Sequence, residues 1–240
     1  MTDFHWFTKP GDGTPGTLNP VFEILDYPIV LGRADETVIT GDAPDTPLID
    51  GREVTDPRLL KALSVPVELD RAEALDRSAK LAGVLRTMGV DTATSRVRVD
   101  ADVPAVARAL SVLAAMRLGV VVDARTDGGE TDPAEADAQS KADVQSEEGA
   151  PVEVRVVAID ADPIEPGRAS VKVVRSRFEG VGVSIAGETA NLDQAMRDSR
   201  VESAEVAPLD PSQTLVLTDD GPLSAAESLP WLEEFLREQR

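Results

Sequence analysis

The sequence contains no cysteine and a single histidine, His5, in 240 residues. Without cysteine the chain forms no disulfide bond, thiolate metal site or cysteine nucleophile. With one histidine near the N-terminus, histidine-based catalytic triads and multi-histidine metal sites are excluded as well. Aromatic residues make up only 3% of the chain, so the core must be built from Val, Leu, Ala and Ile.

Positive charge is also scarce. Lys and Arg number 24 against 44 Asp and Glu, which gives a net charge of −20. Nucleic acids and anionic membranes require a positive surface, so we expect no nucleic-acid partner and no membrane association. The N-terminus has no basic and apolar leader, and no run approaches the ~18 apolar residues that span a bilayer. The sequence therefore predicts a cytoplasmic protein.

Hydrophobic residues at 42% are sufficient for a real core. We expect one domain over 1–240. Residues 1–35 are rich in Gly and Pro and are expected to form an extended arm over that core. Residues 127–150 are acidic and free of aromatics, which is typical of a solvated loop or linker.

Alternating and three-to-four-residue apolar patterns predict the secondary structure. Ser95–Asp123 is expected to be a strand–helix–strand unit, with the helix opening at Pro104 and ending at Gly119. Two parallel strands joined by a helix indicate an α/β fold: a layered αβα domain with a partly parallel mixed sheet. Further strands are expected at 37–40, 47–50, 52–54, 152–159, 170–174, 181–185 and 214–218, and helices at 68–88, 189–199 (capped by Thr189) and 224–238.

Several motifs resemble the N-terminal part of short-chain acyl-CoA synthetases of the acetyl- and propionyl-CoA type, which are adenylate-forming enzymes. The similarity covers Trp6 to Asp123 and resumes weakly at 206–218. It implies the fold of the N-terminal subdomain of those enzymes. The matching segments are Trp6-Phe7, Gly16-Thr17-Leu18-Asn19, Leu25-Asp26, Gly32-Arg33-Ala34-Asp35, the helix 75–90 and Met116-Arg117-Leu118-Gly119-Val120-Val121.

The resemblance fails where that family binds ATP. There, the strand matching 214–218 leads into a loop rich in Ser, Thr and Gly that ends in Pro-Lys-Gly and wraps the phosphates. This sequence continues Asp219-Asp220-Gly221 instead, with two carboxylates and no lysine. The family's adenine-binding segment and catalytic lysine would follow beyond Arg240. The resemblance therefore implies a lost active site, and we assign no catalytic, cofactor-binding or metal residue and no cofactor.

Other residue groups have a functional and a structural interpretation. The basic cluster Arg168, Lys172, Arg175 and Arg177 either holds coenzyme A phosphates, as the resemblance implies, or lies on a solvated strand face, which we favour. Trp231 and Phe235 share a helical face that packs internally or meets another chain. The groups for which we favour structural roles are Asp219-Asp220-Gly221 (a polar turn between a strand and a helix, against half of a Mg²⁺ or Ca²⁺ site), Glu147-Glu148 (solvated loop), Asp127-Gly128-Gly129 (strand exit, against a phosphate loop) and the mid-helix Ser78 and Ser111.

Three functions fit these observations. The first is a non-catalytic, synthetase-like protein that binds a protein partner, either a synthetase or a second copy of itself as an oligomer. The second is a small-molecule module that binds an acyl group, a nucleotide or coenzyme A without chemistry. The third, least favoured, is an enzyme that uses carboxylates and a metal ion.

Overall fold

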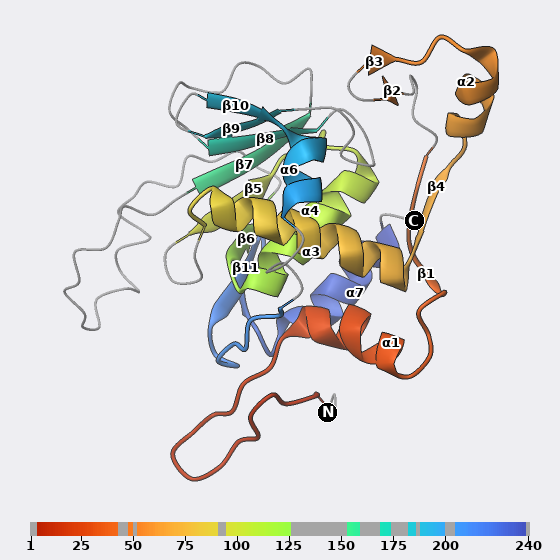
Figure 1. The fold of residues 1–240 in the computed structure, drawn as a ribbon. Coiled ribbons are helices and arrows are strands. Elements are labelled where there is room, and N and C mark those ends of the chain that lie inside the picture. The colour runs from red at the N-terminus through yellow and green to blue at the C-terminus, as the bar shows by residue number, and fades with distance from the viewer. Residues whose placement is uncertain are drawn as a thin grey trace.

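The computed structural model describes residues 4–42, 48–49, 52–90, 95–125, 153–158, 169–173, 182–185, 188–199 and 205–238 (Figure 1). Some predicted features fall outside these ranges. They are the acidic segment 127–150, with Asp127-Gly128-Gly129 and Glu147-Glu148, and the cluster residues Arg168, Arg175 and Arg177. No helix in the described part of the chain is long and apolar enough to cross a membrane.

The predicted extended arm is wrong beyond residue 19. A π-helix, η1 (Phe22–Asp26), runs into the short helix α1 (Tyr27–Val30). Leu18, Val21 and Leu25 are fully buried and belong to the main core. The apolar spacing of these three residues turns the second half of the segment into helix, because burying them against the core outweighs the local Gly and Pro content. The segment from Leu18 to Leu25 is therefore part of the core rather than a cover laid over it.

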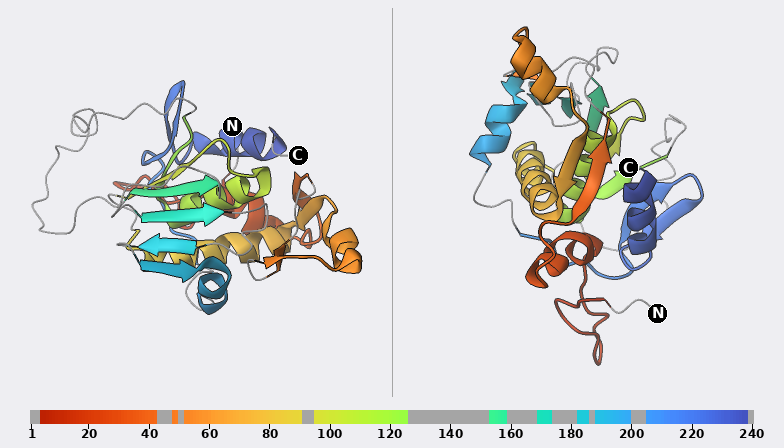
Figure 2. Two further views of the ribbon diagram at one scale, coloured as in Figure 1. Left: turned by 90° about the horizontal axis from the view of Figure 1, so that it is seen from above. Right: turned by 90° about the vertical axis from the view of Figure 1, so that its right-hand side faces the viewer.

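Strands β1 (Thr37–Gly41) and β4 (Val67–Asp70) pair antiparallel. Between them lie the small hairpin β2 (Leu48–Ile49) and β3 (Arg52–Glu53) and the helix α2 (Pro57–Leu63). Both views in Figure 2 show α2 at the far end of this ribbon, away from the sheet. We call residues 48–65 the projecting arm. The sequence predicted its strands but not α2, which Asp56 caps by accepting hydrogen bonds from the amides of Arg58 and Leu59.

Helix α3 (Arg71–Thr87) begins three residues later than predicted. Glu68 pairs with Thr40 in the β1–β4 ribbon, so the first part of the predicted helix is strand. The Asp70 carboxylate then accepts a hydrogen bond from the Glu73 amide at 2.7 Å and caps the helix. The strand pairing therefore takes the residues that helical periodicity alone assigns to α3.

Within the described residues, eight strands form one mixed sheet in the order β10-β9-β8-β7-β5-β6-β11-β12. The central pairs β7–β5, β5–β6 and β6–β11 are parallel, as is β8–β7, whereas β9, β10 and β12 run antiparallel to their neighbours. The strands are β5 (Arg96–Val99), β6 (Val121–Asp123), β7 (Glu153–Ala158), β8 (Ala169–Val173), β9 (Gly182–Ile185), β10 (Glu188–Asn191), β11 (Thr214–Thr218) and β12 (Gly221–Ser224).

Helix α4 (Ala105–Leu118) is buried nearly all round. It packs directly on β5 and β6, and α3 packs against its outer side (Figure 1). Gly119 ends α4 in the left-handed conformation, with φ of 76°, and the chain returns as β6. The predicted strand–helix–strand unit and the α/β class with a mixed, partly parallel sheet are confirmed.

Two predicted helices begin too early because a strand precedes each of them. Thr189 lies in β10 opposite Ser184 rather than at a helix cap, and α6 (Leu192–Asp198) begins after it. Likewise Ser224 ends β12, and α7 (Ser228–Glu238) begins four residues later. In both places the residues form backbone hydrogen bonds with an antiparallel partner strand. The apolar pattern of the sequence does not indicate this pairing.

Candidate functional site

The centre of the sheet has one apolar and one charged face. Val97, Val122 and Val154 are fully buried in the same cluster as the inner side of α4. Side chains alternate along a strand, so the neighbouring residues point to the opposite face. We call this the polar face; its charged members on β5, β6 and β7 are Arg96, Arg98, Asp123, Glu153 and Arg155.

Arg98 occupies the middle of the polar face. It lies in register with Asp123 on one side and with Arg155 on the other. Like charges directly opposite each other destabilise a sheet unless a counter-charge separates them. Asp100, which follows β5, partly supplies that counter-charge.

Two aspartates accept close hydrogen bonds from arginines. Asp123 accepts from Arg125 at 2.8 and 2.7 Å, and Asp100 accepts from Arg155 at 2.9 and 2.8 Å. Burial favours the neutral form of the Asp123 carboxyl, but the hydrogen bonds and charge of Arg125 and the charge of Arg98 outweigh it and hold its pKa below the usual value. The hydrogen bond to Asp100 raises the pKa of Arg155.

Arg96 and Arg98 differ from the other arginines of this group. The closest approaches are 3.9 Å from Arg96 Nη1 to Asp123 Oδ2 and 4.0 Å from Arg98 Nε to Asp100 Oδ1. These distances allow attraction between charges but are too long for hydrogen bonds. Their side chains are 26% and 21% exposed. The polar face thus holds two partly exposed guanidinium groups that donate no hydrogen bond to any described residue.

The segment at the expected phosphate-loop position is a tight β-hairpin. Asp219 and Asp220 form the exposed turn between β11 and β12, and Gly221 has φ of 126°. The Thr218 hydroxyl closes the turn by donating to the Gly221 carbonyl at 2.8 Å. The expectation of a polar turn was correct, but the turn joins two strands rather than a strand and a helix. Nowhere in the described residues do three or more metal-ligating side chains form a group that could hold a metal ion.

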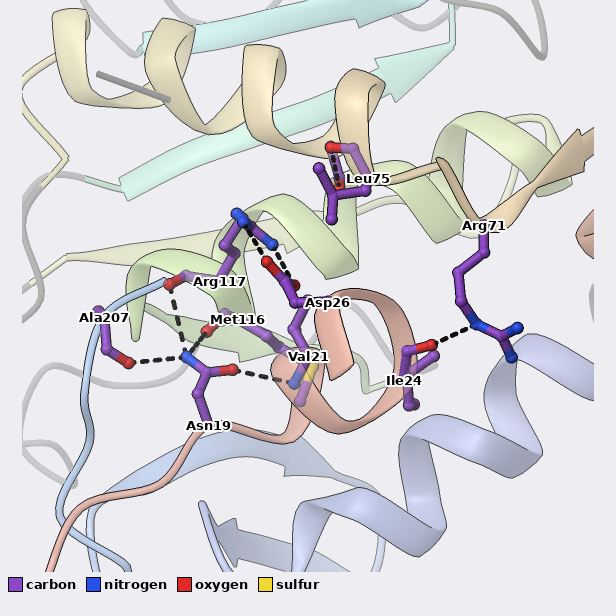
Figure 3. Close-up of polar contacts among 10 residues, drawn as sticks. Asn19, Val21, Ile24, Asp26, Arg71, Leu75, Met116, Arg117 and Ala207 are labelled. Carbon is purple, nitrogen blue, oxygen red and sulfur yellow. Dashed lines mark hydrogen bonds and ion pairs between the residues drawn. The ribbon is translucent and has the colours of Figure 1, made fainter. Parts of the chain in front are cut away.

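Three polar residues of the resemblance motifs meet inside the protein (Figure 3). Asn19 is fully buried, and its Nδ2 donates to the carbonyls of Met116 at 3.1 Å and Ala207 at 3.0 Å. Arg117 of α4 donates from both terminal nitrogens to the carboxylate of Asp26, each at 2.8 Å. These motif residues join the N-terminal segment to the end of α4, so they maintain the fold.

The weakly matching segment 206–218 is held at the same place. Leu18 and Leu209 exchange backbone hydrogen bonds of 3.0 and 2.9 Å, and the Ala207 amide donates to the Arg117 carbonyl at 2.9 Å. These contacts bring the chain into β11 beside β6. The motifs thus determine where β11 and its following turn lie.

The remaining predicted residues have structural surroundings. The hydroxyls of Ser78 and Ser111 donate to carbonyls of their own helices, Leu75 at 3.1 Å and Ala107 at 2.7 Å. Trp231 and Phe235 stack with ring centroids 5.1 Å apart and pack partly against the core. Lys172 lies on β8 in register with Val157. The polar face was not predicted as a site, although the alternation of Arg and Val over Arg96–Val99 was the available signal.

No protein-family model and no curated protein matches the chain. Its fold is similar to that of an acyl-CoA synthetase from Brucella canis, with a TM-score of 0.50 at 13% identity over 84% of this chain and 31% of that one. A benzoate CoA ligase from Burkholderia xenovorans gives 0.48 at 14% identity over 89% and 36%. An anthranilate CoA ligase in complex with anthranoyl-AMP gives 0.47 at 14% identity over 86% and 34%. The chain spans about a third of the length of these structures. It therefore has the fold of one part of an acyl-CoA synthetase, which is the fold that its sequence motifs predicted.

Proposed function

We propose that this chain is a non-catalytic, synthetase-like protein that acts by contacting another protein. One observation carries the proposal: β11 turns back after Asp219 and Asp220 into β12. In the family that the motifs resemble, the matching strand leads into the loop that wraps the ATP phosphates. Here the chain after β11 pairs with β11 itself, so its backbone groups are committed to a hairpin.

The charge of the turn also disfavours the binding of ATP. A triphosphate at this turn would meet two exposed carboxylates. Each pair of like charges ~4 Å apart costs roughly 1 kcal/mol in water and several times more where water is excluded. A phosphate loop has the opposite design, with amides, hydroxyls and a lysine facing the anion. The hairpin therefore disfavours ATP through both its shape and its charge.

Exposed apolar side chains support a protein-binding role. Val30 and Leu31, adjacent at the end of α1, are 78% and 57% exposed. On the projecting arm, Leu59 and Val65 are 46% and 47% exposed. The charged residues of α2 are the basic Arg58 and Lys61, in a chain of net charge −20. A surface with apolar side chains beside basic ones is suited to bind an acidic protein. We propose that the partner is a second copy of this acidic chain or an acyl-CoA synthetase.

Titration calorimetry with Mg²⁺–ATP, AMP and coenzyme A tests the loss of nucleotide binding. We expect no binding heat and no increase in the free energy of unfolding. A site would instead add about 2.7 kcal/mol at a ligand concentration a hundredfold above its Kd. If ATP binds, and binds more tightly to the double variant Asp219→Asn/Asp220→Asn, the hairpin is a nucleotide site and the proposal fails.

Sedimentation measurements test the partner. We expect concentration-dependent self-association, or complex formation with an added acyl-CoA synthetase. The variants Val30→Ser/Leu31→Ser and Leu59→Ser/Val65→Ser each remove one exposed apolar pair, so each serves as the control for the other. Loss of association in one of them identifies the binding surface. If the chain stays monomeric and forms no complex with the synthetase, both proposed partners are ruled out.

The second candidate is a small-molecule module without chemistry. It is favoured by Arg96 and Arg98 on the polar face, whose guanidinium groups donate no hydrogen bond within the described part of the chain.

A further inference from the structure

Arg96 and Arg98 have a hydrogen-bonding capacity that their described surroundings do not use. A guanidinium group carries five N–H donors and is always charged. Each of these two approaches an aspartate only to about 4 Å, at 3.9 and 4.0 Å. Their side chains are 26% and 21% exposed, so part of each guanidinium group is accessible to a ligand from solvent. The pair is therefore suited to a ligand that supplies acceptor oxygens.

The nearby aspartates cannot supply them. Both oxygens of Asp123 accept from Arg125. Asp100 accepts from Arg155 through Oδ1 and forms an ion pair with it through Oδ2. Two further acidic groups lie nearby: Glu153 is exposed in register with Arg96, and Asp102 acts on the charge of Arg155. Neither makes an ion pair with Arg96 or Arg98 among the described residues. The oxygens closest to the two arginines are thus already engaged.

The arrangement of the arginines favours a dianion. Arg96 and Arg98 are two residues apart on one strand face, so their Cα atoms are about 7 Å apart and their long side chains can converge. Arg155 lies in register with Arg98, but its charge is paired with Asp100, so Arg96 and Arg98 are the two arginines open to a ligand. A phosphate group offers more acceptor oxygens than a carboxylate and forms bidentate pairs with arginine.

We propose that Arg96 and Arg98 form a binding site for the phosphate group of a small molecule on the polar face of the sheet. The site does not depend on the proposed protein-binding function, because it lies on β5, two strands from β11. It is also separate from the β11–β12 turn, where Asp219 and Asp220 disfavour ATP.

The test measures phosphate binding to the full chain by ³¹P line broadening at constant ionic strength. Inorganic phosphate and phenyl phosphate are the two probes. We expect either probe to bind, and Arg96→Gln and Arg98→Gln to weaken binding about tenfold or more, as the loss of a charged hydrogen bond predicts. Arg237→Gln is the matched control because it makes the same charge change at an exposed position on α7. It should leave binding unchanged.

Tighter binding of phenyl phosphate than of inorganic phosphate would identify an organic phosphate ester as the ligand; the reverse order would identify free phosphate. If a glutamine variant fails to fold, Arg96→Lys keeps the charge but loses the planar fork, and it should still weaken binding. The proposal is overturned if neither probe binds at millimolar concentration, or if Arg237→Gln loses as much affinity as the other variants.

Discussion

Arg117 and Asp26 form a bidentate ion pair, with both N–O distances 2.8 Å, between residues 91 positions apart. The Arg117 side chain is 1% exposed and that of Asp26 is 18% exposed. A buried pair of this kind adds little net stability compared with apolar residues, but removing one partner leaves a charge without compensation. The pair therefore joins the end of η1 to α4 through two charged groups that depend on each other.

Removing the carboxylate in Asp26→Ala should lower the free energy of unfolding by about 3–5 kcal/mol, because Arg117 then stays buried without its main counter-charge. Glu234→Ala, which removes the exposed partner of Arg237 on α7, should cost less than about 1 kcal/mol. Urea unfolding measures both. Equal losses in the two variants would show that the buried pair has no special role.

Asn19→Asp should destabilise the chain more than Asn19→Ala at pH 7. The amide nitrogen donates to the carbonyls of Met116 and Ala207, and an introduced carboxylate would face these acceptors with a buried negative charge. Burial raises the folded-state pKa of that carboxyl above its unfolded value, so the penalty shrinks as pH falls through the folded pKa. Unfolding measured at pH 7 and pH 5 tests this. If the difference in the free energy of unfolding between the two variants is the same at both pH values, the prediction is contradicted.

Gly16→Ala should destabilise more than Gly13→Ala, although both glycines have nearly the same positive φ, 81° and 82°. An added Cβ at Gly16 would lie 2.7 Å from the Thr8 carbonyl oxygen, whereas nothing lies within 4 Å of one at Gly13. The left-handed conformation alone costs about 1–2 kcal/mol in each variant, and the backbone clash adds to this at Gly16. Thermal unfolding of the two variants isolates the clash. If both variants lose the same amount of stability, the 8–17 turn shifts enough to relieve the clash at no cost.

Stability should depend on Asp123 in acid. Its pKa is lowered in the folded state, so its contribution is fully present above the unfolded value of 3.8 and is lost as pH falls through the lower folded pKa. Asp123→Asn should therefore be less stable than the parent chain at pH 7, and the difference should shrink below pH 4. A constant difference between the two unfolding curves across that range would show that Arg125 does not stabilise the ionised carboxyl.

The sequence predicted those elements whose local pattern and tertiary environment agree. The unit from β5 to β6 has an apolar helix bounded by Pro104 and Gly119, and both of its boundaries were found. Three residues were wrongly predicted to be helical because each lies in a strand that pairs with another strand: Glu68, Thr189 and Ser224. Backbone pairing of that kind leaves no mark in helical periodicity.

The candidate site was predictable only in part. The acidic turn at Asp219 and Asp220 was visible as a departure from a motif. The polar face could not be predicted, because Arg98 becomes part of a charge cluster only when β6 and β7 place Asp123 and Arg155 in register beside it. Residues from three strands have to be aligned before that charge pattern exists.

The order of the strands also has a consequence for biosynthesis. β6 has its final neighbour, β11, only after roughly 90 further residues have been made. At about 5–20 residues per second, the nascent chain leaves that edge unpaired for roughly 5–20 seconds on the ribosome. An open strand edge invites wrong pairing during this interval. Chaperones that shield emerging chains should therefore affect the yield of this protein more than its final stability.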